Sequence, residues 1–101
     1  MKRRETIERA EPATADLAQA FASLDDPHDV VDFLVDLCTP AELEALADRW
    51  AVVPLLVQGV PYRSIHEQTG VSVTTVGRVA RCLDHGTGGY RAALRRHTAG
   101  S

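Results

Sequence analysis

The segment 62–83 constrains the fold most, because its apolar residues and its glycine suit two short helices that cross at a steep angle. Gly70 lies where the first helix must end and the backbone must adopt a positive φ. Ser72 can then cap the second helix by accepting a hydrogen bond from a backbone N–H of its first turn. The pattern predicts a DNA-binding helix-turn-helix over residues 61–83, with buried positions at Ile65, Val71, Val76 and Val79.

The outward side of the second predicted helix carries small residues near its start and arginines further along: Thr74, Thr75, Gly77, Arg78 and Arg81. Small side chains let a helix approach base edges in a major groove, and arginines can meet the flanking phosphates. For Arg63 and Arg81 taken singly, ordinary solvated helix surface is the alternative. Their placement on one face favours DNA contact.

Charge is unevenly distributed along the chain, although its net value is −3. Residues 1–60 contain five Lys or Arg and twelve Asp or Glu, giving −7, whereas residues 61–101 contain six Arg and two acids, giving +4. A DNA-binding surface requires a local positive field, because screening confines charge interactions to about 10 Å. The positive half coincides with the predicted helix-turn-helix, and chance segregation in a small protein is the alternative.

The 101 residues, of which 45% are hydrophobic, suffice for one compact domain with a modest core. The few aromatic residues favour helix packing completed by a partner chain. No apolar run could span a bilayer and no secretory signal is present, so we expect a cytoplasmic protein. Cys38 and Cys82 lack metal-site spacing, and we expect both to be buried as small apolar groups.

Hydrophobic periodicity predicts an all-α fold of about six helices, since no segment alternates with period two. Asp26 is expected to cap a helix that begins at Pro27. We expect a flexible arm over residues 1–11, a single helical domain over residues 12–97 and a disordered tail over residues 98–101.

The clearest helix start is Thr39-Pro40-Ala41-Glu42, with a Thr cap, Pro at the first position and Glu three residues after the cap. The apolar stripe that follows is wide enough for the centre of the fold or a dimer seam. Pro54 removes one backbone hydrogen bond, so we expect a kink near Val53 or a break into two helices, with Gly59 ending the segment. The glycine-rich segment 84–89 is interpreted as a helix stop, because a phosphate-binding loop needs a preceding strand.

The pattern Thr39-Pro40-x-Glu42-x-x-Ala45-Leu46-x-x-Arg49, followed by the helix-turn-helix ending in Arg78, resembles the Trp repressor superfamily. The segments 36–39 and 83–90 are more similar to its YerC/YecD-like branch. The resemblance covers roughly residues 17–95. It implies an obligate homodimer of two intertwined, all-helical chains that together carry two DNA-reading heads.

The resemblance also implies which residues contact DNA. The family's base-contacting arginine falls on Arg63, whose planar guanidinium can bond both major-groove acceptors of a guanine. The contacts at the start of the recognition helix fall on Val73, Thr74, Thr75 and Gly77. Phosphate contacts, which would set register without reading sequence, are expected at Tyr62, His66, Ser72 and Arg81.

An effector pocket is a separate question raised by the resemblance. Thr39, Arg49 and Arg78 match the polar residues around the bound amino acid in the Trp repressor. Val79, however, stands where that repressor has a glycine, and Cys82 stands where it has a serine. A β-branched side chain fills space that an indole needs, and a thiol is a poor partner for an ammonium. We therefore expect no cofactor and no tryptophan binding, and a different small effector stays open.

These observations predict a homodimeric, sequence-specific DNA-binding transcriptional regulator that represses by occupying an operator with two half-sites about one helical turn apart. The alternative is a non-catalytic protein-interaction module that keeps the helix-turn-helix as scaffold and docks a basic partner on its acidic first half. No nucleophile, base and orienting group recur at a spacing that would bring them together, so we expect no enzymatic activity and no metal site.

Overall fold

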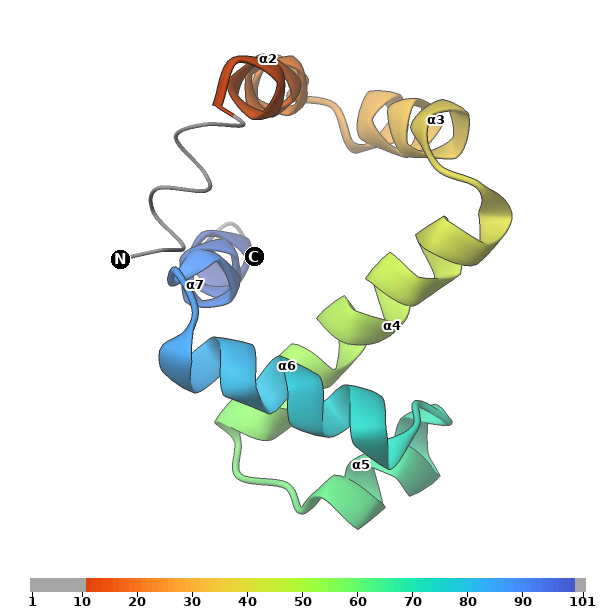
Figure 1. Cartoon of the computed structure of the whole chain (residues 1–101), viewed down its shortest axis with the longest axis vertical. Coiled ribbons are helices and arrows are strands. Elements are labelled where there is room, and N and C mark those ends of the chain that lie inside the picture. The colour runs from red at the N-terminus through yellow and green to blue at the C-terminus, as the bar shows by residue number, and fades with distance from the viewer. Residues whose placement is uncertain (1–10, 100–101) are drawn as a thin grey trace. The chain divides into compact units, whose positions relative to one another are not determined.

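The computed structural model describes residues 11–99, which contain six helices and no strand. The helices are α2 (Glu11–Ala22), α3 (Pro27–Leu37), α4 (Pro40–Val57), α5 (Tyr62–Thr69), α6 (Val73–His85) and α7 (Gly89–Ala99) (Figure 1). The all-α prediction is confirmed for this part of the chain. The chain divides into two compact units, residues 1–39 and 40–101. A single domain over residues 12–97 stays a prediction.

The first unit contains α2 and α3. Asp26 caps α3 as predicted, because its carboxylate accepts a hydrogen bond of 2.9 Å from the His28 N–H and Pro27 takes the first helical position. The rings of Phe21 and Phe33 meet edge to face, with centroids 5.0 Å apart. Neither helix contains a buried residue. The described part of this unit, from residue 11 on, therefore has no closed core of its own in a single chain.

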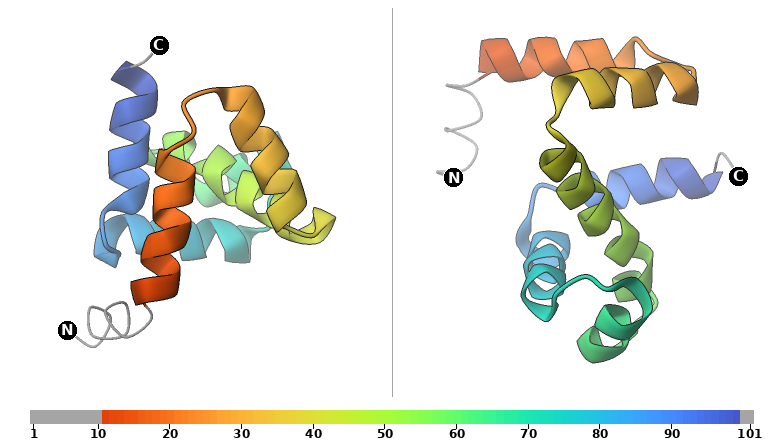
Figure 2. Two further views of the ribbon diagram at one scale, coloured as in Figure 1. Left: turned by 90° about the horizontal axis from the view of Figure 1, so that it is seen from above. Right: turned by 90° about the vertical axis from the view of Figure 1, so that its right-hand side faces the viewer.

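The second unit packs α4, α5, α6 and α7 around one small core. In Figure 1, α6 crosses the C-terminal half of α4, and Figure 2 shows α7 passing beside α4. Four core residues are the ones predicted from the helix-turn-helix pattern, and they are joined by two valines of α4; the buried set is Val52, Val53, Ile65, Val71, Val76 and Val79. The core thus holds the helix-turn-helix against α4.

The helix α4 runs unbroken through Pro54. Of the two expected outcomes, the break into two helices is wrong, and the kink near Val53 stays a prediction. The buried neighbours Val52 and Val53 anchor the middle of the helix, and their burial offsets the one missing hydrogen bond. The Pro54 carbonyl still accepts a hydrogen bond of 3.0 Å from the Gln58 N–H. The helix ends at Val57, shortly before Gly59 with its φ of 84°, close to the predicted end.

The last helix, α7, extends to Ala99, so Thr98 and Ala99 are helical rather than part of the expected disordered tail. The rings of Trp50 and His97 meet edge to face with centroids 6.0 Å apart, which fixes the end of α7 against α4. Residues 100–101 and 1–10 of the predicted tail and arm lie outside the described residues, and Glu11 begins α2. No helix within residues 11–99 is long and apolar enough to cross a membrane.

The two cysteines differ in their surroundings. Cys38 is partly buried, as expected for a small apolar group, whereas Cys82 is exposed. The expectation of a buried Cys82 is therefore wrong for the single chain. The reason is helical geometry, because α6 already directs Val76 and Val79 into the core and leaves Cys82 on its solvent side.

Candidate nucleic-acid interface

A short turn joins α5 to α6, and local hydrogen bonds hold it. Gly70 adopts a φ of 79°, as predicted, and its N–H donates to the His66 carbonyl at 2.8 Å. The Thr69 hydroxyl donates to the Ile65 carbonyl at 2.7 Å and accepts from the Val71 N–H at 3.1 Å. The angle between the two helices is therefore fixed by side chains of the turn as well as by the core.

His66 also belongs to this turn. Its Nδ1 lies 2.8 Å from the Val71 carbonyl oxygen, which can only accept, so Nδ1 carries a proton and donates it. In a neutral ring Nε2 is then an acceptor, and a phosphate contact through Nε2 requires the charged imidazolium. The structural roles of His66 and Thr69 were missed from the sequence, because they depend on where the Val71 backbone lies. The phosphate contact of His66 stays a prediction.

Ser72 caps α6 as predicted. Its Oγ accepts a hydrogen bond of 3.1 Å from the Thr75 N–H, and its hydroxyl donates to Thr75 Oγ1 at 2.9 Å. The Ser72 hydroxyl is thus engaged as both donor and acceptor, whereas the hydroxyl proton of Thr75 remains available to a ligand. Of these two residues, Thr75 is the better placed to donate to DNA.

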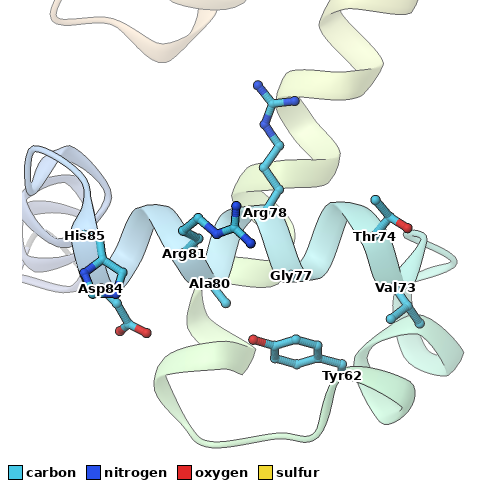
Figure 3. A pocket seen from close by; sticks show the side chains of 9 residues that line it. All are labelled: Tyr62, Val73, Thr74, Gly77, Arg78, Ala80, Arg81, Asp84 and His85. Carbon is cyan, nitrogen blue, oxygen red and sulfur yellow. The ribbon is translucent and has the colours of Figure 1, made fainter. Parts of the chain in front are cut away.

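The outward side of α6 and the first residue of α5 line an open hollow of about 710 Å³ on the surface (Figure 3). Six predicted DNA-contacting residues line it: Tyr62, Val73, Thr74, Gly77, Arg78 and Arg81. Three further lining residues were missed, namely Ala80, Asp84 and His85. They follow Gly77 by three, seven and eight residues, and residues at this spacing share one face of a helix, so the sequence could have predicted them. Arg63, His66, Ser72 and Thr75 lie on the same two helices or the turn, outside this hollow.

Arginines give the hollow its positive character. Arg78 and Arg81 are both exposed, and Figure 3 shows Arg78 projecting away from the side of α6 that Tyr62 occupies. The one acid that lines it, Asp84, lies 3.9 Å from Nη2 of Arg91. Arg91 Nε also donates to the Leu83 carbonyl at 3.3 Å. Exposed pairs of this kind contribute little stability, but Arg91 offsets the negative charge that Asp84 would present to DNA.

The proposed effector residues are not gathered in this hollow. Thr39 belongs to the first unit, whereas Arg49 and Arg78 belong to the second. Of the three, Arg78 lines the hollow. Val79 is a core residue, and Cys82 is exposed on α6. Within residues 11–99, no group of three His, Cys, Asp or Glu is arranged to hold a metal ion.

The helix-turn-helix lies inside the segment 14–98, which matches the family model described as Trp repressor protein. The chain belongs to the Trp repressor family. This confirms the resemblance inferred from the sequence and places the protein in a regulatory, non-enzymatic family whose members bind DNA through a helix-turn-helix.

Known relatives agree with this membership. The uncharacterized protein YerC of Bacillus subtilis (strain 168) is 40% identical over 80 residues, which cover 79% of this chain and 77% of YerC. A TrpR-like protein from Eubacterium eligens ATCC 27750 has a TM-score of 0.80 and 37% identity, covering 86% of this chain and 90% of its own. A structure assigned to a Trp repressor of Staphylococcus aureus has a TM-score of 0.84 and 32% identity, with coverage of 91% and 93%.

Proposed function

We propose that this protein is a sequence-specific transcriptional regulator that binds DNA as a homodimer and represses by occupying its operator. The observation that carries the proposal is the exposed face of α6. It begins with small residues, continues with Arg78 and Arg81, and is held at a fixed angle to α5 by the hydrogen bonds of the turn. A rigid helix of this kind can enter a major groove and place its arginines beside phosphate.

Apolar side chains that are exposed to solvent in a single chain support the proposed homodimer. Val31 and Val35 of α3 are each 56% exposed, and no residue of α2 or α3 is buried. Exposed apolar surface of this extent indicates a protein partner. A second copy related by a two-fold axis would cover it and would present two reading heads, so the operator should contain two half-sites about one helical turn apart.

Base reading is assigned to the first turns of α5 and α6. Arg63 is exposed at the start of α5 and would read a guanine through a bidentate contact. Thr74 and Thr75 would offer hydroxyls to bases or bridging waters, and Arg81 would hold a phosphate. Occupation of an operator requires no chemistry on the DNA. The proposed mechanism also includes no tryptophan, because Val79 would fill the space that an indole ring needs and Cys82 is a poor partner for the ammonium group of an amino acid.

Selection of bound fragments from a random DNA pool tests the proposal, with parallel selections in the presence of individual amino acids. We expect one enriched sequence with two related half-sites spaced by about 10 base pairs, and the same sequence with and without tryptophan. A failure to enrich any sequence would overturn the proposed function. A protein-interaction module that keeps the helix-turn-helix as scaffold would give that result.

A further inference from the structure

Two exposed apolar side chains stand on the surface assigned to DNA. Val73 is 47% exposed at the start of α6, and Tyr62 is 44% exposed at the start of α5. Both line the hollow on α6, and Figure 3 shows both on the same side of that helix. Phosphate oxygens gain nothing from a valine or from the face of a phenol ring. A ligand that covers these two side chains therefore has to offer them an apolar group.

Gly77 leaves an opening between these two side chains. A Cβ at this position would meet only Tyr62 Cε2, at 3.7 Å, which is an ordinary contact. The backbone does not require glycine either, because the positive φ values among the described glycines belong to Gly59, Gly70 and Gly88. Glycine is unfavourable inside a helix. Neither packing nor backbone conformation within the chain explains Gly77, so the open space itself is the feature that a ligand can use.

The occupant must match both the apolar walls and the charge around them. Arg81 lines the same hollow, so a positive charge stands beside the opening, which favours DNA over an apolar protein segment. In the major groove, the C5-methyl group of thymine is the apolar group that base edges present, and the other recognition groups are hydrogen-bond donors and acceptors.

We propose that Tyr62, Val73 and Gly77 form an apolar notch that receives the methyl group of a thymine in each operator half-site. This inference rests on the proposed function and deepens it, because it names one base of the operator. It assigns the Tyr62 ring to base recognition instead of the phosphate contact expected from the sequence. Arg63 and the notch would then read different positions of the same half-site.

Replacement of single thymines by deoxyuridine tests the notch, because it removes only the methyl group. The probe is a fluorescent duplex carrying the site selected from the random pool, titrated with the full chain. We expect one thymine per half-site at which deoxyuridine raises Kd by roughly fourfold, the value that corresponds to burial of one methyl group. Every other thymine should tolerate the replacement.

Two variants assign the effect to the notch. Val73→Ala should bind the thymine and deoxyuridine duplexes with equal Kd, because the wall that contacts the methyl group is gone. Gly77→Ala should also abolish the difference, because its methyl group fills the notch. Val57→Ala is the matched control, since Val57 is 48% exposed at the end of α4, and it should keep the fourfold difference.

The outcomes separate the notch from the proposed function. If the wild-type chain binds no duplex, both the proposed function and the notch are overturned. If it binds a selected site but no single deoxyuridine changes Kd, the notch alone is overturned. A methyl effect that persists unchanged in both Val73→Ala and Gly77→Ala also overturns it, because the methyl group is then read elsewhere.

Discussion

Two glycines of the helix-turn-helix, Gly70 and Gly77, occupy their positions for different reasons. Gly70 has a φ of 79° with open space around its missing Cβ, so its backbone alone requires glycine. Gly77 is helical, and a Cβ there is tolerated within the chain. Substitution by alanine should therefore change the free energy of unfolding in opposite directions at the two positions.

Gly70→Ala should lower the free energy of unfolding by about 1–2 kcal/mol, the cost of a side chain in the left-handed region. Gly77→Ala should raise it by up to about 1 kcal/mol, because alanine is the better helix former, while weakening DNA binding. Urea denaturation and fluorescence polarisation on the same samples measure both effects. Unchanged DNA affinity in Gly77→Ala would show that the open space at Gly77 has no part in binding.

Arg63 and Arg81 should differ in how they affect DNA recognition. Arg63→Ala removes a bidentate base contact, so it should cost about 1–3 kcal/mol on the selected site and flatten the preference over unrelated DNA. Arg81→Ala removes a phosphate contact and should weaken all sequences alike. Competition titrations with selected and random duplexes measure the ratio. An unchanged sequence preference in Arg63→Ala would show that base reading is assigned to the wrong residue.

Single residues also show what the sequence could and could not predict. The buried positions Ile65 and Val76 and the turn at Gly70 follow from spacing and φ preference, which are local properties, and they are confirmed. The bond from His66 to the Val71 carbonyl depends on the path of the turn in space. The exposure of Cys82 depends on which neighbours on α6 already fill the core. The hydrogen bond could not be inferred from spacing, whereas the exposure of Cys82 follows from helical geometry once Val76 and Val79 occupy the core.

The start of α6 contributes both to helix stability and to the proposed DNA binding. Ser72→Ala removes the cap of the Thr75 N–H and should lower the free energy of unfolding by about 1 kcal/mol. Ser72→Asp keeps a capping oxygen and should retain most of the stability, but its charge beside phosphate should weaken DNA binding. Thermal unfolding and polarisation distinguish the two variants. Equal DNA affinity in Ser72→Asp and wild type would place the start of α6 away from phosphate.

The helix α4 lacks the break at Pro54 that was one of the two outcomes expected from the sequence. Pro54 signals a break by local rules, because it lacks a donor and crowds the preceding turn. In the structure α4 continues through it, because Val52 and Val53 are fully buried against the helix-turn-helix. The continuity of α4 at Pro54 therefore depends on packing against helices that lie later in the sequence, and the sequence of α4 alone does not indicate that packing.

The proposed function requires two copies of the chain. Sedimentation equilibrium should give twice the 11.0 kDa chain mass, and the urea midpoint should rise with protein concentration because unfolding is linked to dissociation. Val35→Asp places a charge on the exposed face of α3 and should shift the protein towards monomer. The matched change Val57→Asp, on α4, should shift it less. A concentration-independent monomer would contradict the proposed dimer.

The proposed function depends on the α5–α6 face, which would bind DNA through its arginines and through base contacts. The most direct measurement is the salt dependence of Kd for the selected duplex. Arg78 and Arg81 of the two helix-turn-helix units would neutralise about four phosphates. The slope of the logarithm of the association constant against the logarithm of the salt concentration should then be roughly −3 to −4. Arg81→Ala removes one of these contacts from each chain and should reduce the magnitude of the slope by about 2 per dimer. If the protein does not bind the duplex, or if Kd does not change with salt concentration, the proposed DNA-binding face is contradicted.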